Sequence, residues 1–308
     1  MAGSCSTCCG SSPVGGSAVR VLYNPAAGSG RGARAIAGIR AAFARCGFTD
    51  VRATRHAGDE ARLVAEAITD GVETLVVAGG DGTWSNCAVP LARAGSPARL
   101  AILAAGTGND FAKNLGTRPR DARTLAERLA DGGVTERRVD MGRVDDIWFL
   151  NVAGMGFDVA CNAAAERLRP LPGAPRYVVA ALAELFRYEG LPIGVDGAPM
   201  RRRLLAVAAN GAHFGGAFRI APDARIDDAA LDVVVVDDLP GLARLPVLLR
   251  ALRGAHLTHA AVTHQRTARV TLTFPAAPLI EADGELRQAA SAMVEVASVP
   301  AALRLVAD

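Results

Sequence analysis

Three glycine-rich segments in the first half of the chain hold the residues best suited to bind phosphate and a metal ion. The clearest is GGDGT, residues 79–83, which follows a short apolar run. Paired glycines let a backbone approach a polyphosphate without a Cβ clash, and the free amides and the Thr83 hydroxyl can donate to phosphate oxygens. Asp81 offers a carboxylate to magnesium, directly or through water. Taken alone, the same letters also suit an ordinary strand-to-helix turn.

Two further segments strengthen the phosphate interpretation. The first, NPAAGSG at residues 24–30, precedes a helical pattern that starts near Arg31, and anions are favoured at the start of a helix. The other, GTGND at residues 106–110, offers Thr107, Asn109 and Asp110 as a second set of phosphate and metal ligands. Neither G-x-x-x-x-G-K-[ST] nor G-x-G-x-x-G occurs in the chain, which disfavours the two commonest nucleotide-binding folds.

The elements around these segments place them at one edge of a sheet. Apolar and β-branched runs predict strands at residues 19–23, 51–54, 74–77 and 100–103, and helical spacing predicts a helix at 59–69. Strands that alternate with helices indicate a parallel sheet, in which ligands bind beyond the carboxyl ends of the strands. We therefore predict an α/β domain over residues 18–142 with the three glycine turns at its ligand-binding edge.

The pattern changes in the second half of the chain. Strand patterns recur at residues 148–152, 204–208, 231–236 and 270–274, with few helices between them. We predict a mainly β, antiparallel sandwich over residues 143–308, whose last strand is a candidate to rejoin the first domain. Two arginine-flanked helical segments, 175–188 and 242–253, are interpreted as domain helices with one buried face, with contact to a membrane as the alternative.

Six stretches together resemble a known family. NPAAGSGRG, GGDGT and AAGTGNDFAKNLG occur in this order, followed by NVAGMGFDVA, the segment of residues 208–236 and ADGE. This set is similar to the diacylglycerol kinase catalytic family, which includes bacterial soluble lipid kinases and the sphingosine and ceramide kinases. The resemblance covers nearly all of the chain beyond its first eighteen or so residues. It implies a three-layer α/β domain of the NAD kinase/phosphofructokinase type, a β-sandwich domain, and transfer of phosphate from ATP to a lipid hydroxyl.

The resemblance also implies roles for particular residues. ATP would lie between the domains, and the matching positions are Asn24, Pro25, Ala26, Ala27, Gly28, Thr54, Gly80, Asp81, Gly82, Thr83 and Thr107. Magnesium would lie in a water network with Asp81 and Asp110, and a second magnesium on a loop that contains Arg225, Asp228 and Ala230. The late turn holds Asp283 and Glu285, either of which would accept the proton of the lipid hydroxyl. Without the resemblance, its Asp-Gly pair predicts only a hairpin turn.

Three departures from the family pattern bear on affinity for nucleotide or metal. GGDGT is usually followed by x-Asn-Glu, but here the chain continues Trp84-Ser85-Asn86. Asp228 precedes alanine where glycine is usual, and Ser29 stands where a basic residue is common. Two other functions therefore stay open at this stage. One is an NAD kinase, which also uses a GGDGT loop, and the other is a nucleotide- or lipid-binding regulator that has lost catalysis.

The composition sets the remaining expectations. A formal net charge of +3 over 308 residues does not indicate nucleic acid binding, and it suits weak attraction to phosphate or anionic lipid. No secretory signal or membrane-spanning stretch is visible, so we expect a cytoplasmic protein that touches membranes peripherally and transiently. The expected partner is a lipid substrate at a membrane surface, and a homodimer stays open.

The six cysteines fall into two groups. Three of them lie in a Gly/Ser-rich stretch, residues 1–17, which we predict to be a flexible tail without a zinc site. Cys46, Cys87 and Cys161 are scattered through patterned segments and are predicted to be small core residues.

Overall fold

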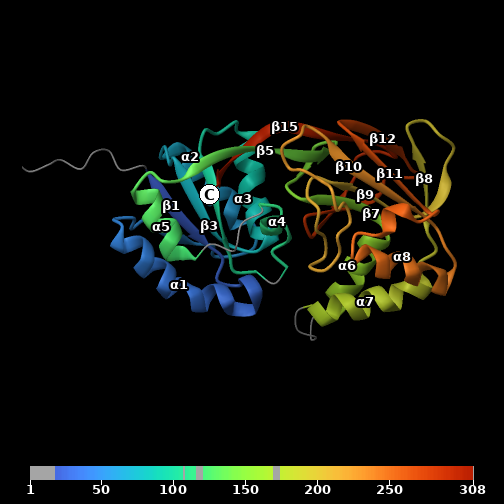
Figure 1. Ribbon diagram of the computed structural model, residues 1–308, viewed down its shortest axis with the longest axis horizontal. Helices are drawn as coiled ribbons and strands as arrows, with labels where there is room; N and C mark the ends of the chain where they lie inside the picture. Colours follow the sequence, from blue (N-terminus) through green and yellow to red (C-terminus); the bar gives the residue numbers. More distant parts are fainter. Residues whose placement is uncertain (1–17, 107, 116–120, 169–173, 308) are drawn as a thin grey trace, which may run out of the picture.

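The structure is a computed structural model that describes residues 18–106, 108–115, 121–168 and 174–307. It has two lobes that lie side by side along the long axis of the molecule (Figure 1). The first lobe contains the elements from β1 to α5, and the second contains those from β7 to β14. The long strands β5 and β15 run between the two lobes.

The first domain is built on a parallel sheet. Its own strands are β1 (Val19–Tyr23), β2 (Val51–Ala53), β3 (Thr74–Gly79) and β4 (Arg99–Ala104). All their pairings are parallel, in the order β2-β1-β3-β4. Every residue of β3 is buried, as expected for a central strand that is covered on both faces.

Helices cover both faces of this sheet. α1 (Ala27–Arg45) and α5 (Ala122–Ala130) pack on one face, where Val21, Val76 and Ala101 point. α2 (Asp59–Thr69) and α3 (Asp81–Arg93) pack on the other, toward Leu22 and Leu100. Because successive strand residues point to opposite faces, each strand contributes to both cores. The result is the three-layer α/β arrangement predicted from the sequence.

The second domain is an antiparallel sandwich. One sheet contains β7 (Val152–Gly156), β9 (Arg201–Ala209), β10 (Leu231–Asp237), β11 (Val262–Thr267), β13 (Leu279–Ala282) and β14 (Glu285–Gln288). Strands β12 (Arg269–Thr273), β15 (Met293–Ala307), β5 (Thr135–Val144) and β6 (Ile147–Phe149) form the other sheet, and β8 (Leu191–Val195) pairs with both. A core that includes Phe149, Ile193, Leu272 and Val294 fills the space between them.

Three helices cover the outer side of the first of these sheets. They are α6 (Phe157–Arg167), α7 (Ala174–Arg187) and α8 (Arg244–Ala251), which follows a short 3-10 turn, η1 (Gly241–Ala243). In Figure 1 they lie together at the lower edge of the second lobe. Their inner sides meet a second apolar cluster that includes Phe157, Leu205 and Val247.

Strand β15 ties the two domains together. Its first part pairs antiparallel with β12, and Arg304 and Leu305 near its end pair parallel with β4. It also pairs with β5 along most of its length, with an irregularity between Val299 and Leu303. The last strand of the chain thus completes the sheet of the first domain.

The predicted fold class is confirmed, and three local predictions are wrong. Residues 148–152 do not form one strand, because β6 ends at Phe149 and β7 begins at Val152. Helix α1 starts at Ala27, four residues earlier than its apolar period indicated. Of Cys46, Cys87 and Cys161, only Cys87 is buried, while the other two are partly exposed. The predicted tail lies outside the described residues.

Candidate active site

The three glycine-rich turns meet at one edge of the parallel sheet. Because β1, β3 and β4 run parallel, their carboxyl ends lie side by side. The turns after β3 and β4 touch at two glycines, since a Cβ added to Gly106 would lie 2.5 Å from the Cα of Gly80. The turn after β1 joins them, because Asn24 Nδ2 donates to Thr83 Oγ1 at 3.1 Å. The three turns therefore form one continuous surface.

The first turn is organised by Asn24. Its side-chain Oδ1 accepts a hydrogen bond from the Ala26 amide at 2.9 Å, and α1 begins at the next residue, Ala27. Gly28, in the first turn of this helix, has a φ of 59°, which favours glycine. Thr54 follows the neighbouring strand β2 and is buried. Residues 24–28 and Thr54, all predicted to bind nucleotide, thus lie at the same sheet edge.

The third turn is closed by Asn109. Its side chain accepts from the Gly106 amide and donates to the Gly106 carbonyl, both at 3.1 Å. Asn109 itself has a φ of 50°, a conformation that asparagine tolerates better than most residues. Thr107, predicted from the resemblance to contact nucleotide, lies outside the described residues.

Two carboxylates face each other across Gly108. Asp81 is the first residue of α3, and its Oδ1 accepts from the Phe111 amide at 2.9 Å. Asp110 is the first residue of the short helix α4 (Asp110–Lys113). A Cβ on Gly108 would lie 3.3 Å from Asp81 Oδ2 and 3.6 Å from Asp110 Oδ2, so a side chain there would fill the space between the two carboxylates. Burial raises the pKa of Asp81, and the neighbouring carboxylates Asp110 and Asp283 raise it further.

This carboxylate pair fits a magnesium ion. Carboxylate oxygens are preferred ligands of magnesium, which usually keeps several waters and is completed by substrate phosphates. A cation beside Asp81 would offset the repulsion that raises its pKa. Asp110 already binds the Lys113 ammonium at 2.6 Å and the Gly216 amide at 2.6 Å, which favours contact through water for this residue. Within the part of the chain that the structure describes, no cluster of three or more His, Cys, Asp or Glu side chains could enclose a metal.

The loop predicted to hold a second magnesium is differently arranged. The Asp228 carboxylate is paired with Arg266 on β11, and its other oxygen accepts from the Ala230 amide at 3.1 Å. The Arg225 guanidinium points to Asp227, with 3.7 Å between Nε and Oδ1. A cation on this loop would compete with Arg266 for the Asp228 carboxylate, and the second metal site stays a prediction.

The late acidic turn faces the GGDGT helix. Asp283 joins β13 to β14 with a φ of 49°, and its carboxylate accepts four hydrogen bonds. Ser85 Oγ donates at 2.6 Å, and the amides of residues 150, 151 and 152 donate at 2.5, 2.9 and 3.0 Å. Burial raises the pKa of Asp283, although these hydrogen bonds act in the opposite direction. Next to it, Glu285 accepts from Asn86 Nδ2 at 3.1 Å and is paired with Arg287.

Ser85 and Asn86 are site residues that the sequence interpretation missed. They stand where the family pattern has Asn and Glu, and were noted only as departures. In the structure each donates to one carboxylate of the acidic turn. One signal was available: Ser85 follows Asp81 by four residues, which puts both on the same side of α3.

A second set of polar residues links the domains beside the carboxylates. Lys113 Nζ reaches the Gly216 carbonyl at 2.9 Å. Asn114 donates to Asn151 Oδ1 at 3.1 Å and accepts from the Ala212 amide at 2.9 Å. Lys113 and Asn114 belong to the quoted AKNLG motif but received no role from the sequence. They hold the third glycine turn against the second domain.

A buried carboxyl pair lies behind the acidic turn. Asp158 on α6 sits over Gly154, where a Cβ would come within 1.7 Å of Asp158 Oδ2. Glu281 lies directly opposite Gly154 in the pairing of β13 with β7, and it accepts a hydrogen bond from the Gly284 amide. Neither oxygen of Asp158 has a hydrogen-bond partner among the described residues, nor has Glu281 Oε2. Burial raises the pKa of Asp158 to about 7. Burial also raises the pKa of Glu281 well above its ordinary value.

The contact between Gly80 and Gly106 predicts that Gly106→Ala separates the two turns. The new methyl group would meet backbone at 2.5 Å and Asn109 Oδ1 at 2.7 Å, distances that require the turns to move apart. We expect Mg-ATP binding, measured by isothermal titration calorimetry, to weaken by at least about tenfold. Gly38→Ala on α1 is the control, because a Cβ there meets nothing within 4 Å. Equal ATP affinity in both variants would show that the turns do not share one ligand.

The buried Asp158 carboxyl predicts a pH-dependent stability difference. Its pKa is raised from 3.8 to about 7, so the folded state binds this proton more tightly than the unfolded state. Folding stability is therefore lost as the pH rises through this range, by up to about 1.4 kcal/mol per pH unit. We expect Asp158→Asn to gain stability relative to the native chain as the pH rises from 4 to 7. Urea unfolding at several pH values measures this, and a constant difference would contradict the buried, unpaired carboxyl.

Comparison with known proteins agrees with this geometry. Residues 18–144 match the model of the diacylglycerol kinase catalytic domain, and residues 151–307 match that of the YegS C-terminal NAD kinase beta sandwich-like domain. A diacylglycerol kinase of Mycobacterium tuberculosis is 33% identical over 297 residues, covering 93% of this chain and 94% of that protein. A protein of Xanthomonas euvesicatoria named "Probable lipid kinase YegS-like" is 35% identical over 273 residues, covering 83% of this chain and 85% of that protein.

The fold is also similar to solved structures. The crystal structure of a diacylglycerol kinase from Bacillus anthracis superimposes with a TM-score of 0.69 at 19% identity, covering 95% of this chain and 97% of that one. At this identity the likeness concerns the fold alone. The two domain models and the sequence relatives confirm the resemblance seen in the motifs: the chain belongs to the diacylglycerol kinase family of lipid kinases.

Proposed function

We propose that the protein transfers the γ-phosphate of ATP to the hydroxyl of a diacylglycerol-like lipid at a membrane surface, with Mg²⁺ as cofactor. One observation carries the proposal. The glycine turns suited to phosphate, the Asp81–Asp110 pair and the acidic turn are contiguous, and the Ser85–Asp283 hydrogen bond of 2.6 Å closes the gap between the domains. In-line transfer requires phosphate, metal and acceptor hydroxyl to meet at such a point.

The phosphate end of the site relies on backbone groups. The N-termini of α1 and α3 both begin in glycine turns, and helix N-termini attract anions. Thr83 is buried and its Oγ1 accepts a hydrogen bond from Asn24, so it also holds two turns together. Magnesium bound near Asp81, with Asp110 contributing through water, would offset charge on the β- and γ-phosphates. Positioning and charge neutralisation of this kind are the main needs of phosphoryl transfer.

Asp283 is the better candidate for the base that accepts the lipid hydroxyl proton. A carboxylate has about four acceptor sites, and all four of Asp283 are used in the ligand-free chain. Three donors are backbone amides that fix its position, whereas the fourth, the Ser85 hydroxyl, can rotate away. An acceptor hydroxyl can take the place of Ser85 on Asp283. The raised pKa of Asp283 suits a general base, because a more basic carboxylate takes the proton more readily.

The base assignment predicts unequal effects of two isosteric changes. Asp283→Asn removes the basic carboxylate and should lower kcat by about 10²–10⁴-fold. Glu285→Gln should lower kcat by less than about tenfold, since it keeps an acceptor for Asn86. Steady-state kinetics with Mg-ATP and diacylglycerol micelles measures both, and thermal unfolding checks that each variant is folded. A larger loss in Glu285→Gln than in Asp283→Asn would transfer the role of base to Glu285.

The acceptor class is tested by a radiolabelled-ATP screen. The purified chain is incubated with Mg-ATP and, separately, with diacylglycerol, phosphatidylglycerol, a sphingoid base, ceramide and NAD. We expect label in a lipid product, with diacylglycerol-like acceptors preferred. NADP formation without any lipid phosphate would favour the NAD kinase alternative. ATP binding without transfer to any acceptor would favour a binding regulator.

Association with the membrane is part of the proposal. No helix among the described residues is long and apolar enough to cross a bilayer. Cytoplasmic location, transient contact with the membrane and a homodimer all stay predictions.

A further inference from the structure

Helix α7 is apolar on both of its sides. Its inner side is buried at Ala180 and Leu185, as in an ordinary domain helix. Its outer side exposes Val179, Leu182 and Phe186, at 45%, 53% and 63%. These residues are spaced three and four apart and so form one stripe. A surface helix normally carries polar residues on its outer side. Burial in the domain therefore explains the apolar inner side of α7 but not its apolar outer side.

The neighbouring segment η1–α8 repeats this feature. Leu242, Leu249 and Leu252 are exposed at 69%, 54% and 41%, while Val247 and Ala251 are buried beneath them. Leu249 and Leu252 are three residues apart at the end of α8, so they lie on the same side.

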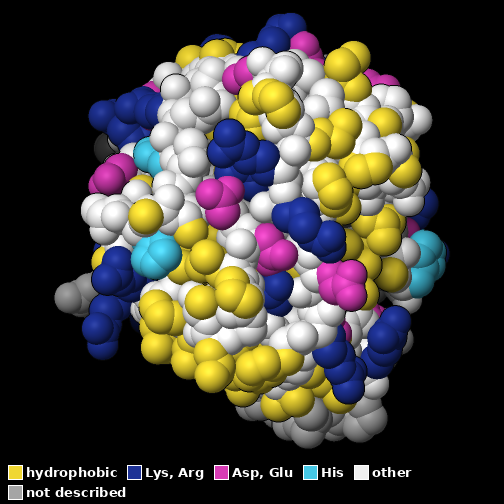
Figure 2. Space-filling view, turned by 90° about the vertical axis from the view of Figure 1, so that its right-hand side faces the viewer, with side chains coloured by type: hydrophobic (Ala, Val, Ile, Leu, Met, Phe, Trp, Pro, Cys, Tyr) yellow, Lys and Arg dark blue, Asp and Glu magenta, His cyan; other side chains and the backbone are white. Residues whose placement is uncertain are grey.

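The two apolar sides form one surface. A Cβ on Gly241 would lie 3.9 Å from the Phe186 ring, which places the start of η1 against the end of α7. The buried Arg244 guanidinium locks this contact by donating to the Leu185 carbonyl at 2.7 Å and the Leu239 carbonyl at 2.6 Å. In Figure 2, hydrophobic side chains gather along the lower part of this end of the molecule, where α7 lies in Figure 1. We call the residues Val179, Leu182, Phe186, Leu242, Leu249 and Leu252 the apolar face.

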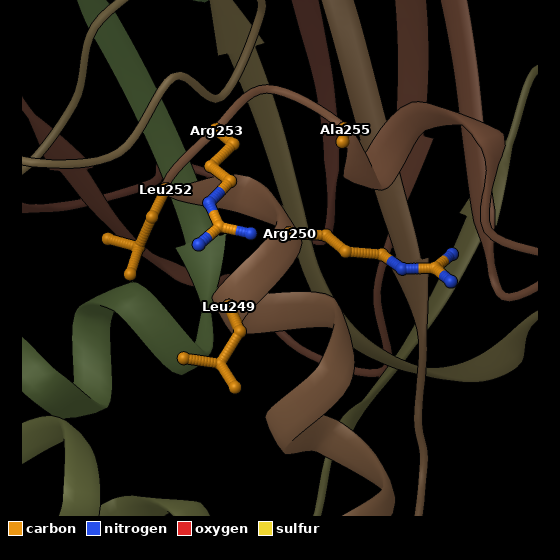
Figure 3. A pocket seen from close by; sticks show the side chains of 5 residues that line it. All are labelled: Leu249, Arg250, Leu252, Arg253 and Ala255. Atoms are coloured by element: carbon orange, nitrogen blue, oxygen red, sulfur yellow. The ribbon is translucent and has the colours of Figure 1, made fainter.

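Unpaired arginines border the apolar face. Neither Arg187 nor Arg253 makes an ion pair or a side-chain hydrogen bond within the described part of the chain. Leu249, Leu252 and Arg253 line a shallow hollow of about 250 Å³ with Arg250 and Ala255. Figure 3 shows the Arg253 guanidinium close to the two leucines, whereas Arg250 extends the opposite way. The hollow thus combines an apolar wall with a free guanidinium.

Few acidic side chains lie beside these arginines. Residues 241–255 contain no Asp or Glu. Glu184, the single acidic residue of α7, is partly buried, and its negative charge helps to raise the pKa of the Cys161 thiol on α6. The nearby acidic side chains are already paired: Glu189 with Arg202, Asp237 with Arg203, and Asp238 with Arg244.

We propose that the apolar face docks on an anionic lipid bilayer, with the leucines and Phe186 entering its interface and Arg187 and Arg253 binding headgroup phosphates. Exposed apolar patches of this kind mark interaction sites, and a helix with apolar residues and arginines binds at the bilayer interface. A second copy of the chain is a poorer partner, because a two-fold contact would bring arginines together without acidic residues to pair with them. The inference rests on the proposed lipid kinase activity, since it explains how the enzyme reaches its acceptor.

Vesicle co-sedimentation of the full chain tests the docking surface. Phosphatidylcholine vesicles are compared with vesicles that also contain phosphatidylglycerol. We expect binding to the mixed vesicles, weakened by salt. Arg187→Gln/Arg253→Gln should weaken it about thirtyfold, at roughly fivefold for each arginine. Leu182→Ser/Phe186→Ser should weaken it at least about tenfold, because less apolar surface enters the bilayer.

Matched variants separate docking from general surface effects. Leu279→Ser/Met293→Ser removes two other exposed apolar side chains, and Arg45→Gln/Arg138→Gln removes two exposed arginines, one on α1 and one on β5. Both controls should bind vesicles as the native chain does. Binding by the apolar-face variants that equals the controls would overturn the proposal. So would a native dimer that these variants convert to a monomer while vesicle binding is unchanged.

Kinase assays keep this inference distinct from the proposed function. With diacylglycerol in anionic vesicles, the apolar-face variants should show a raised KM, whereas a short-chain diacylglycerol dispersed in water should be phosphorylated at the native rate. If the native chain binds vesicles through this face but phosphorylates no lipid, docking stands and the proposed function fails. If it phosphorylates lipid while the variants keep native vesicle affinity and native KM, the function stands and docking fails.

Discussion

The carboxylate of Asp283 joins the two domains at the candidate active site. It accepts a hydrogen bond from Ser85 on the first domain's α3 and three from the amides that follow β6. Hydrogen bonds to a charged acceptor are short and strong, so this one group fixes the acidic turn against the GGDGT helix. It also explains why β6 and β7 are separate strands, since the amides of residues 150 and 151 turn toward Asp283 rather than into a sheet.

The site is assembled around more negative charge than the chain itself neutralises. Asp81, Asp110 and Asp283 converge from three segments. The carboxyls of Asp158 and Glu281 lie behind them, but burial raises the pKa of both and so favours their neutral forms. Lys113 is the cation that the chain places directly on this group, through Asp110. Such an arrangement favours a divalent ion brought with a polyphosphate, because the ion offsets both sets of charges. In a family of lipid kinases, this explains why the carboxylates gather beside turns that suit phosphate.

Much of the fold could be predicted from local sequence. The apolar runs of β1, β3 and β4 and the helical spacing of residues 59–69 are strong periodic signals. Their alternation also places the three glycine turns at one edge of the sheet. The second domain was harder, because short strands such as β6 and β7 follow each other without a clear turn signal. Helix α6 was missed, since it follows the buried strand β7 with an alanine-rich stretch whose apolar period is weak.

The contacts that complete the site could not be predicted in this way. Ser85 and Asp283 are 198 residues apart, and no periodicity links them. Ser85 and Asn86 were noted as departures from a pattern, although they are the residues that touch the acidic turn. The lack of a hydrogen-bond partner for the Asp158 carboxyl also depends on tertiary structure. The same holds for the exposed outer side of α7, because its apolar residues would equally suit a helix that is buried on all sides.

The most direct test of one shared site is the position of a bound metal and nucleotide. Crystals grown with Mn²⁺ and a non-hydrolysable ATP analogue would reveal the metal by anomalous scattering. The account predicts an anomalous peak beside Asp81 and Asp110, with the terminal phosphate directed toward Asp283. A nucleotide bound away from the three glycine turns, or a manganese peak only on the loop of residues 225–230, would contradict it.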